Sequence, residues 1–414
     1  MAATLQTLGL AALSLSSLAY AQQAGGGEKH PCLTSQYCTK KDGCTTLQTS
    51  VVIDSGSHAI QNIKTGDSCL ADGGLDEASC PNVKKCGKNC EIVGISDYAS
   101  HGVTTSGSSM TLQMYVNGES ASPRVYLLDP SGKNYELLKL NGQEFTFDVD
   151  MHDLPCGMNG ALYFSEMEAS GGRSKYNPAG AEYGTGYCDA QCFNTSSFIN
   201  GVANVNQLGA CCNEMDIWEA NSVATAYTPH TCTKPGFYEC AGDECGPDGI
   251  CDKNGCGFNP YALGKHNFYG PYDKVNTARP FTVVTQFITN DGTTSGTLQE
   301  IRRIYKQGNK IIQNVAVKFQ DGTINSLTNP YCSATADGFT ERGGLAEMGE
   351  ALGRGMVLAM SIWNDAGGYM NWLDAGKAGP CAPKEGKPSR IEKNDPGTHV
   401  VFSNIKWGDI GSTY

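Results

Sequence analysis

The chain has 414 residues, of which 17% are charged, 51 are glycine and 19 are cysteine. Abundant glycine and few charges favour many short strands joined by turns, and they exclude a coiled coil or an intrinsically disordered chain. The formal net charge of −12 repels phosphate groups, which argues against nucleic acid as a partner.

The first 21 residues have the pattern of a secretory signal peptide. An apolar stretch over residues 8–13 is followed by the sequence AYA at residues 19–21, the small-x-small pattern that signal peptidase cleaves. The mature chain is therefore expected to begin at Gln22 and to be secreted to the extracellular space. Beyond this segment no apolar run approaches the ~18 residues of a membrane span, so no membrane association is expected.

Export also explains the cysteines, because an oxidising compartment lets disulfides persist. Some pairs, such as Cys86 with Cys90 and Cys188 with Cys192, have a spacing that zinc ligands also use. In a secreted chain these thiols are expected to be oxidised, so no metal is predicted. Since 19 is odd, at least one thiol has no partner within the chain. The sequon that begins at Asn194 is a candidate glycosylation site on a surface loop.

Alternating apolar and polar residues, punctuated by glycine or proline, predict antiparallel strands. These strands are expected over residues 125–128, 145–149, 161–167, 281–288 and 400–407. A short helix is predicted where Leu345, Met348, Gly349 and Leu352 form one face. No repeat or linker divides residues 22–414, which indicates one domain. The fold class predicted is all-β, a two-sheet antiparallel β-sandwich of the concanavalin-like jelly-roll type, with a groove on one curved face.

Three carboxylates lie within six residues of the segment NEMDIWEA, residues 213–220. On a regular strand Glu214 and Asp216 share one face, while Met215 and Ile217 point into the core. Strict alternation would place Glu219 on the opposite face. A β-bulge between Asp216 and Glu219 would bring all three carboxylates to one side, and such bulges are frequent beside active sites.

Carboxylates crowded on one face repel one another, so at least one is expected to stay protonated, as a general acid must. Two carboxyl groups ~5–5.5 Å apart suit a retaining glycosidase, in which one is the nucleophile and the other the acid and then the base. An exposed acidic strand and a calcium site are the alternative interpretations. Two other acidic pairs with this spacing are interpreted as solvated strand faces: Asp148 with Asp150, and Glu166 with Glu168.

At this segment the sequence resembles the family 7 glycoside hydrolases, the fungal cellulases, whose signature is a Glu-x-Asp-x-x-Glu strand. Three further segments match in the same order: CGMNGALY at residues 156–163, YGTGYCDAQC at residues 183–192 and FSNIK at residues 402–406. The resemblance runs from around position 30 to the C-terminus. It implies a curved jelly-roll sandwich with a long substrate groove, and retaining hydrolysis of β-1,4-glucan.

By position in the motif, the resemblance implies that Glu214 is the nucleophile, Glu219 the acid/base, and Asp216 the residue that assists Glu214. His230 matches a family histidine near the acid/base. The other matched positions are implied to line the groove: Arg124, Asn159, Tyr163, Tyr187, Asp189 and Gln191. No metal or organic cofactor is expected, because the acid, the nucleophile and water suffice for this chemistry.

Sugar rings present flat C–H faces that stack on aromatic side chains, so tryptophans are candidate platforms. Trp363 and Trp372 resemble the family's platforms on either side of the cleavage point. Trp218 and Trp407 are predicted to pack within the protein instead.

The resemblance also implies a disulfide pattern that leaves Cys32 unpaired. The implied bonds are Cys38–Cys44, Cys69–Cys90, Cys80–Cys86, Cys156–Cys381, Cys188–Cys211, Cys192–Cys212, Cys232–Cys251, Cys240–Cys245 and Cys256–Cys332. Two of them would tie the start of the catalytic strand to the segment between Cys188 and Cys192 and hold the carboxylates at a fixed separation.

Cellobiohydrolases of this family cover the groove with long loops, whereas its endoglucanases leave an open cleft. Here the segment between Cys245 and Cys251 is short, residues 372–381 are few and lack arginine, and residues 54–58 lack tryptophan. These features favour an endoglucanase. Ala190 stands where many chain-end cutters have serine, and it is expected to retune Glu214.

The chain ends without a linker or cellulose-binding module, so soluble or amorphous glucan is the expected substrate, and a monomer is the expected state. Cellulose, mixed-linkage glucan and xylan are not ranked by these features. Two alternative functions are a cellobiohydrolase of the same family and a non-catalytic glucan-binding jelly roll.

Overall fold

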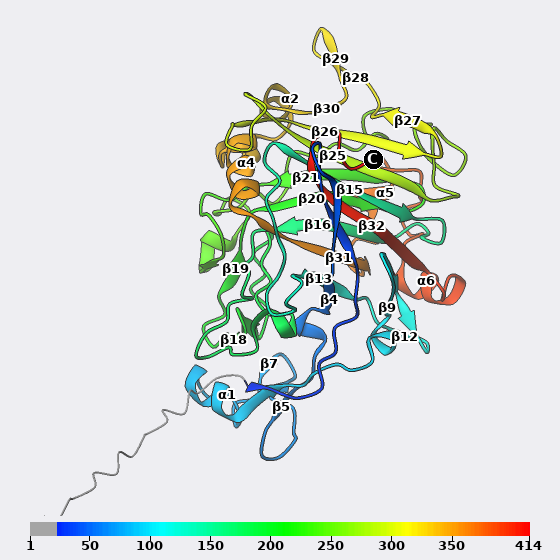
Figure 1. The fold of residues 1–414 in the computed structure, drawn as a ribbon. Coiled ribbons are helices and arrows are strands. Elements are labelled where there is room, and N and C mark those ends of the chain that lie inside the picture. The colour runs from blue at the N-terminus through cyan, green and yellow to red at the C-terminus, as the bar shows by residue number, and fades with distance from the viewer. Residues whose placement is uncertain (1–22) are drawn as a thin grey trace, which may run out of the picture.

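The computed structural model describes residues 23–414, and the predicted signal peptide lies outside the described residues. Two large, mostly antiparallel sheets face each other and enclose the main hydrophobic core (Figure 1). This arrangement confirms the predicted β-sandwich. Within residues 23–414, no helix is long and apolar enough to cross a lipid bilayer.

The outer layer is a ten-stranded sheet. Its main path runs through β27 (Lys310–Gln313), β26 (Leu298–Gln307), β25 (Phe281–Thr289), β15 (Gln143–Asp150), β32 (His399–Asp409), β10 (Ser109–Gln113) and β9 (Val103–Ser106). Off this path, β2 (Ser35–Thr39) pairs with β32 and with β3 (Gly43–Leu47), and β30 (Ser326–Thr328) pairs with β26.

The second layer is a seven-stranded sheet, which descends in Figure 1 from β21 to β4. Its strands are β21 (Thr225–His230), β20 (Glu214–Ala220), β16 (Met158–Ser165), β31 (Met356–Asn364), β13 (Arg124–Leu128) and β4 (Ser50–Ile53), with β14 (Leu137–Leu138) paired to β31. All five predicted strands are present. The one expected over residues 161–167 is displaced, because β16 begins at Met158 and ends at Ser165.

Short strands and helices surround the two layers. The short strands are β1 (Gln23–Ala24), β5 (Ile60–Asn62), β6 (Leu70–Ala71), β7 (Gly74–Leu75), β8 (Cys90–Ile92), β11 (Tyr115–Val116), β12 (Glu119–Ser120), β17 (Phe198–Ile199), β18 (Val202–Ala203), β19 (Gly209–Cys211), β22 (Tyr238–Cys240), β23 (Tyr269–Gly270), β24 (Val275–Asn276), β28 (Val317–Phe319) and β29 (Gly322–Ile324). The helices are α1 (Val83–Asn89), α2 (Asn329–Thr335), α3 (Asp337–Glu341), α4 (Gly344–Arg354), α5 (Asn371–Asp374) and α6 (Pro388–Asn394), and single helical turns cover Ser55–Ser57, Tyr98–His101, Gly180–Tyr183 and Gly242–Cys245.

Helix α4 is the predicted helix, and its apolar face packs on the end of β26. Leu345, Met348 and Leu352 are fully buried. A Cβ atom on Gly349 would lie 2.7 Å from the Cβ of Leu298, so only glycine allows this close packing. The glycine that interrupts the helical pattern is therefore required by the contact between helix and sheet.

Aromatic side chains fill the space between the two sheets around Trp218. Its ring is fully buried and meets those of Phe147 and Tyr305 edge to face, with centroids 6.0 and 6.4 Å apart. Each large apolar side chain buried in this way contributes about 1.5–3 kcal/mol to stability. Trp407 is also buried and contacts the ring of Tyr37. Both tryptophans pack as predicted.

Seven of the nine implied disulfides are confirmed, and Cys32 is free and exposed. The other two were predicted wrongly, because the bonds are Cys188–Cys212 and Cys192–Cys211. Neighbouring residues of an extended chain point to opposite sides. Cys212 turns toward Cys188 beside Ser165, while Cys211 turns the other way, into a cluster with Cys192.

Candidate active site

A cleft of about 910 Å³ crosses the seven-stranded sheet. It runs from Asp54, next to β4, across β13, β31, β16 and β20 to Lys253 and Leu263 beyond β21. The predicted site residues that line it are Arg124, Tyr163, Tyr187, Asp189, Gln191, Glu214, Asp216, Glu219, His230, Trp363 and Trp372. Side chains from segments far apart in the sequence therefore meet along one groove.

Strand β20 carries the three clustered carboxylates, and it contains the predicted bulge. The register with β21 shifts between Asp216 and Glu219, so that Ile217 and Trp218 stand together opposite Tyr227. The side chains of Ile217 and Trp218 are both buried in the core. The extra residue restores Glu219 to the cleft side, and all three carboxylates line the groove.

Glu214 lies at the start of β20 and is almost fully buried. Its Oε2 atom accepts a hydrogen bond of 3.1 Å from the backbone N–H of Ala190. Burial raises the pKa of Glu214 well above its usual value, and the charges of Asp216 and Asp189 act in the same direction. The Ala190 N–H and the charge of His230 oppose this rise, because both stabilise the carboxylate.

The carboxyl group of Asp216 lies beside the imidazole of His230. The Nε2 atom of His230 lies 3.1 Å from Oδ2 of Asp216, and its Nδ1 lies 3.1 Å from the backbone oxygen of Asp252. The Asp252 carbonyl oxygen only accepts, so Nδ1 donates to it and Nε2 faces the Asp216 carboxyl group. Burial raises the pKa of Asp216 to about 8, with the charge of Asp189 adding to it. His230 thus contacts Asp216 rather than Glu219.

Glu219 is held by Asn159, the one predicted groove residue that does not line the cleft. Asn159 is fully buried, and its Nδ2 donates a hydrogen bond of 3.1 Å to Oε1 of Glu219. Its Oδ1 accepts from the N–H of Ala220 at 3.0 Å. Asn159 therefore lies behind the groove surface, which corrects the expectation that it lines the groove. Burial raises the pKa of Glu219 to about 8, and the charge of Asp216 contributes to the rise.

Arg124 anchors the Glu214 side of the cleft. Its guanidinium pairs with Asp54 at 3.1 Å and lies 3.5 Å from the ring centroid of Tyr187. The Tyr187 hydroxyl is 3.2 Å from that of Tyr163. Asp189 accepts a hydrogen bond of 3.0 Å from the backbone N–H of Cys192, and burial raises its pKa. These contacts give the wall a fixed set of polar groups facing the groove.

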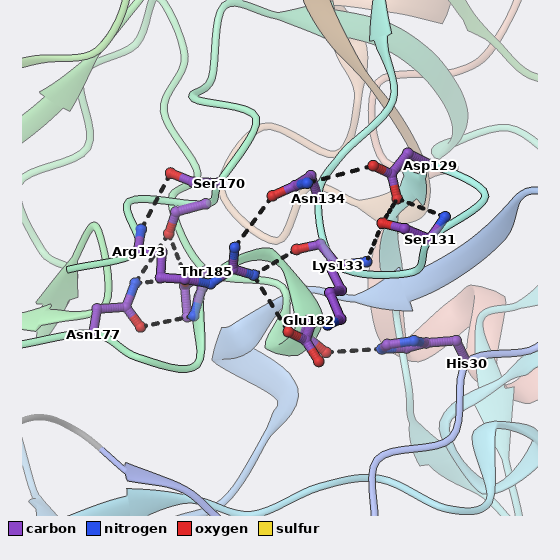
Figure 2. A network of polar contacts seen from close by, with 12 residues as sticks. His30, Asp129, Ser131, Lys133, Asn134, Ser170, Arg173, Asn177, Glu182 and Thr185 are labelled. Atoms are coloured by element: carbon purple, nitrogen blue, oxygen red, sulfur yellow. Dashed lines mark hydrogen bonds and ion pairs between the residues drawn. The ribbon is translucent and has the colours of Figure 1, made fainter. Parts of the chain in front are cut away.

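The loop that leads to Tyr187 is fixed by the polar network in Figure 2. Asn177 donates to the backbone oxygen of Gly171 at 3.0 Å and to Oγ1 of Thr185 at 2.9 Å. Arg173 bonds to Asn134 at 3.2 Å and pairs with Glu182 at 3.4 Å. Most of these bonds close the loop on itself, and the bond to Asn134 ties it to a segment 39 residues away, so they position the wall residues that follow the loop.

A second network supports the residue before Glu214. Asn213 donates to Glu166 at 2.7 Å and accepts from the backbone N–H of Cys232 at 2.7 Å. Glu166 is only 5% exposed and also pairs with Arg354. The expectation that Glu166 lies on a solvated strand face is therefore wrong, because Arg354 and Asn213 satisfy its charge inside the protein.

Trp363 and Trp372 form one stacked pair, with ring centroids 6.3 Å apart and an angle of 28° between the rings. They therefore make a single continuous aromatic surface, where two separated platforms were expected. The surface stands beside Ala226, the register partner of Glu219. Trp372 is 48% exposed, so its ring is open to a ligand.

Comparison with known proteins decides the family. The family model described as "Glycosyl hydrolase family 7" matches residues 23–414. The chain belongs to glycosyl hydrolase family 7. The endo-beta-1,4-glucanase celB of Aspergillus oryzae is 57% identical over 407 residues, which cover 97% of this chain and 98% of that protein.

Solved structures of family 7 agree with the fold. The native endocellulase EGI of Humicola insolens superposes with a TM-score of 0.91 at 50% identity, covering 95% of this chain and 100% of that chain. A family 7 cellobiohydrolase from Daphnia pulex has a TM-score of 0.90 at 37% identity, with the same coverage. The sandwich is thus common to relatives named for internal and for chain-end cleavage.

The three segments that favour an endoglucanase contribute little to the wall of the cleft in this family 7 enzyme. Among the described residues that line the cleft, none comes from residues 246–250. Residues 54–58 contribute Asp54 and Ser57, and the stretch after Trp372 contributes Ala378. This placement agrees with the open cleft that the loop lengths predict.

Among the cleft residues that the sequence did not predict, Lys253 and Phe193 carry chemistry that a ligand could use. Lys253 donates from Nζ to the backbone oxygen of Ala190 at 2.8 Å, and burial lowers its pKa to about 8. Phe193 lines the cleft with 53% of its surface exposed. Phe193 directly follows Cys192 of a matched segment, and this position offered a signal. No motif around Lys253 in the sequence indicated that it would line the cleft.

Proposed function

We propose that this family 7 enzyme is a secreted, retaining endo-β-1,4-glucanase that hydrolyses internal bonds of cellulose or related glucans. Residues 1–21 would be its signal peptide and residues 22–414 its single catalytic domain. The observation that carries the proposal is the bulge in β20, which brings Glu214, Asp216 and Glu219 into one open cleft. A monomer suffices, because one chain supplies every group that the reaction uses.

In the first step, Glu214 attacks the anomeric carbon of the sugar bound above it. Glu219 gives its proton to the glycosidic oxygen as the carbon–oxygen bond breaks, so the leaving chain departs as an alcohol. A covalent ester joins the sugar to Glu214. The raised pKa of Glu219 supports this role, since the acid must hold its proton in the free enzyme.

In the second step, Glu219 acts as the base. It takes a proton from water, the water oxygen bonds to the anomeric carbon, and the ester bond to Glu214 breaks. Both carboxyl groups return to their starting states, and two displacements retain the configuration. Asp216 and His230 assist Glu214, because the charge of Asp216 raises the pKa of the nucleophile and the charge of His230 lowers it.

Binding is assigned to the two sides of the cleft. The Trp363–Trp372 pair and Phe193 offer faces for sugar rings. Arg124, Tyr163, Tyr187, Asp189 and Gln191 offer donors and acceptors for sugar hydroxyls.

Internal cleavage is favoured over attack from chain ends. The relative from Aspergillus oryzae and the Humicola insolens structure are both named for endo-acting enzymes. The short segments over residues 246–250 and 372–381, and the lack of tryptophan in residues 54–58, also favour a cleft that a polymer can enter from the side. A cellobiohydrolase is the second candidate, because the Daphnia pulex enzyme has nearly the same fold.

The test compares the viscosity of carboxymethylcellulose with the reducing ends released, for wild type, Glu214→Gln and the control Glu168→Gln. Glu168 is exposed and lies outside the cleft lining. We expect wild type and the control to lower viscosity steeply per bond cut, and Glu214→Gln to lose activity on the order of 1,000-fold or more. Reducing ends with little viscosity loss would indicate chain-end cleavage. Their absence in wild type would indicate a glucan-binding protein without catalysis.

A further inference from the structure

Arg303 is a fully buried cation in the core of the sandwich. Among residues 23–414 it makes no ion pair with a carboxylate. Burying an unpaired cation is costly, because it gives up the hydration of its charge. Its other contacts must therefore offset this cost, and those that it makes with the opposite sheet lie at one place.

The side chain of Arg303 extends from β26 across the interface between the two sheets. Its Nη2 donates a hydrogen bond to the backbone oxygen of Ile217, and its Nε donates to Oγ1 of Thr285 at 3.3 Å. The guanidinium carbon lies 4.3 Å from the ring centroid of Tyr227 and 5.7 Å from that of Trp218. Aromatic rings at such distances attract a cation.

The three residues that Arg303 contacts on the catalytic sheet are the three residues of the bulge. Ile217 and Trp218 are the pair on β20, and Tyr227 is the single residue opposite them on β21. A bulge interrupts the ladder and leaves backbone groups of the extra residue without strand partners. The Ile217 carbonyl is buried away from water, and Arg303 supplies it with a hydrogen-bond donor.

We propose that Arg303 is a positioning residue that clamps the β20 bulge and thereby sets where Glu219 stands relative to Glu214. The inference rests on the proposed function. Glu214 and Asp216 precede the bulge, and Glu214 is held separately by Ala190. Glu219 follows the bulge, so a change in the register there moves the acid/base while the nucleophile stays in place.

A displaced acid affects substrates according to their leaving group. A dinitrophenolate leaves as a stable anion and needs no proton, whereas phenolate needs one from Glu219. Because kcat/KM reports the first, bond-breaking displacement, the ratio of the two kcat/KM values measures delivery of the proton. General loss of folded enzyme lowers both values equally and leaves that ratio unchanged.

The experiment measures kcat/KM of wild type and Arg303→Met on phenyl and dinitrophenyl β-cellobioside. We expect the phenyl substrate to lose about 10- to 100-fold and the dinitrophenyl substrate less than about 3-fold. Arg303→Lys keeps a donor for the Ile217 carbonyl and should recover part of the loss. Equal losses on both substrates, or none on either, would overturn the proposal.

Arg302→Met is the matched control, because this neighbour on the same strand pairs with Glu300 at 2.8 Å away from the bulge. It should keep the wild-type ratio, and a changed ratio would also overturn the proposal. If Arg303→Met does not fold, Thr285→Val decides instead, since it removes the acceptor that orients the guanidinium. A smaller loss confined to the phenyl substrate supports the clamp, and an unchanged ratio overturns it.

Azide gives a second measurement on the dinitrophenyl substrate. Azide attacks the anomeric carbon of the covalent ester and releases Glu214 without needing a base, so it bypasses a misplaced Glu219. We expect azide to raise kcat of Arg303→Met and to leave wild type unchanged. The absence of this rescue would overturn the proposal. If wild type cleaves neither cellobioside, the proposed glucanase function has failed, which is a separate result.

Discussion

The backbone N–H of Ala190 donates a hydrogen bond of 3.1 Å to Oε2 of Glu214. This bond reaches the nucleophile from outside its own strand, on the short segment between Asp189 and Gln191. Because it stabilises the anionic form, it is one of two contacts that oppose the effect of burial on the pKa of Glu214. Residue 190 therefore lies directly beside the nucleophile.

The first prediction concerns Ala190→Ser. A hydroxyl that donates to Glu214 stabilises the carboxylate, so the pKa of Glu214 falls and the acidic limb of the pH dependence of kcat/KM moves to lower pH. The measurement is the pH profile on a soluble cello-oligosaccharide. Ala190→Gly, which adds no donor, is the control. An acidic limb that moves to higher pH in Ala190→Ser would contradict the prediction.

The second prediction concerns the alkaline side of the same profile. Catalysis needs Glu219 protonated in the first step, and burial raises its pKa to about 8. Above the acidic limb, the value of kcat/KM should therefore hold up to that pH and fall about tenfold per pH unit beyond it. Glu219→Gln keeps the shape of the group but has no proton to lose, so its residual kcat/KM on dinitrophenyl cellobioside should lack this limb. If the alkaline fall of kcat/KM persists in Glu219→Gln, a group other than Glu219 causes it.

The third prediction concerns the effect of the Glu219 carboxyl group on the free energy of unfolding. The pKa of Glu219 is higher in the folded protein, near 8, than the ordinary 4.5. Between these values the folded state binds more protons than the unfolded state, so the free energy of unfolding falls as pH rises. Glu219→Gln removes this loss. We expect the variant to be more stable than wild type by on the order of 1–3 kcal/mol at pH near 8 and equal to it near pH 4.

Thermal unfolding of both proteins across this range tests the expectation. Glu168→Gln again serves as the control, because this exposed carboxylate should not change the pH dependence. A stability difference between Glu219→Gln and wild type that stays constant with pH would show that the buried charge is not its cause. A positive result would also show that the catalytic site is kept at the expense of stability.

The bulge in β20 shows how far the sequence carries the prediction of the site. Strict alternation places Glu219 on the face opposite Glu214. A retaining glycosidase needs both on one face, and this need predicted an irregularity between Asp216 and Glu219. The contacts that stabilise the irregularity were not predictable, because Arg303 lies 86 residues from Ile217 in the sequence. Strand periodicity thus located the carboxylates but not what holds them.

The residues that were placed wrongly share this cause. Asn159 lies in β16, which is buried along its whole length, so alternation gives no sign of which side chains reach the cleft. Glu166 looked like a solvated residue because its partner Arg354 is 188 residues away. Burial of a polar group depends on partners that only the folded chain brings near.

The fourth prediction concerns the two disulfides that were paired wrongly from the sequence. The separations in sequence are 24 and 19 residues in the observed pairing, and the alternative differs by one residue in each, so chain length does not discriminate between them. With the observed pairing, Cys188→Ser/Cys212→Ser removes one bond and leaves the other intact. Cys188→Ser/Cys211→Ser breaks both bonds and leaves Cys192 and Cys212 without their partners.

Titration of free thiols in the unfolded, unreduced proteins distinguishes the two pairings. Wild type and Cys188→Ser/Cys212→Ser should each give the single thiol of Cys32. Cys188→Ser/Cys211→Ser should give two more, or a new bond that peptide mapping detects between Cys192 and Cys212. Its stability should also fall further, because each lost disulfide typically costs about 2–4 kcal/mol. The reverse order of thiol counts would restore the pairing expected from the sequence and would require Cys211 and Cys212 to exchange the sides that they face.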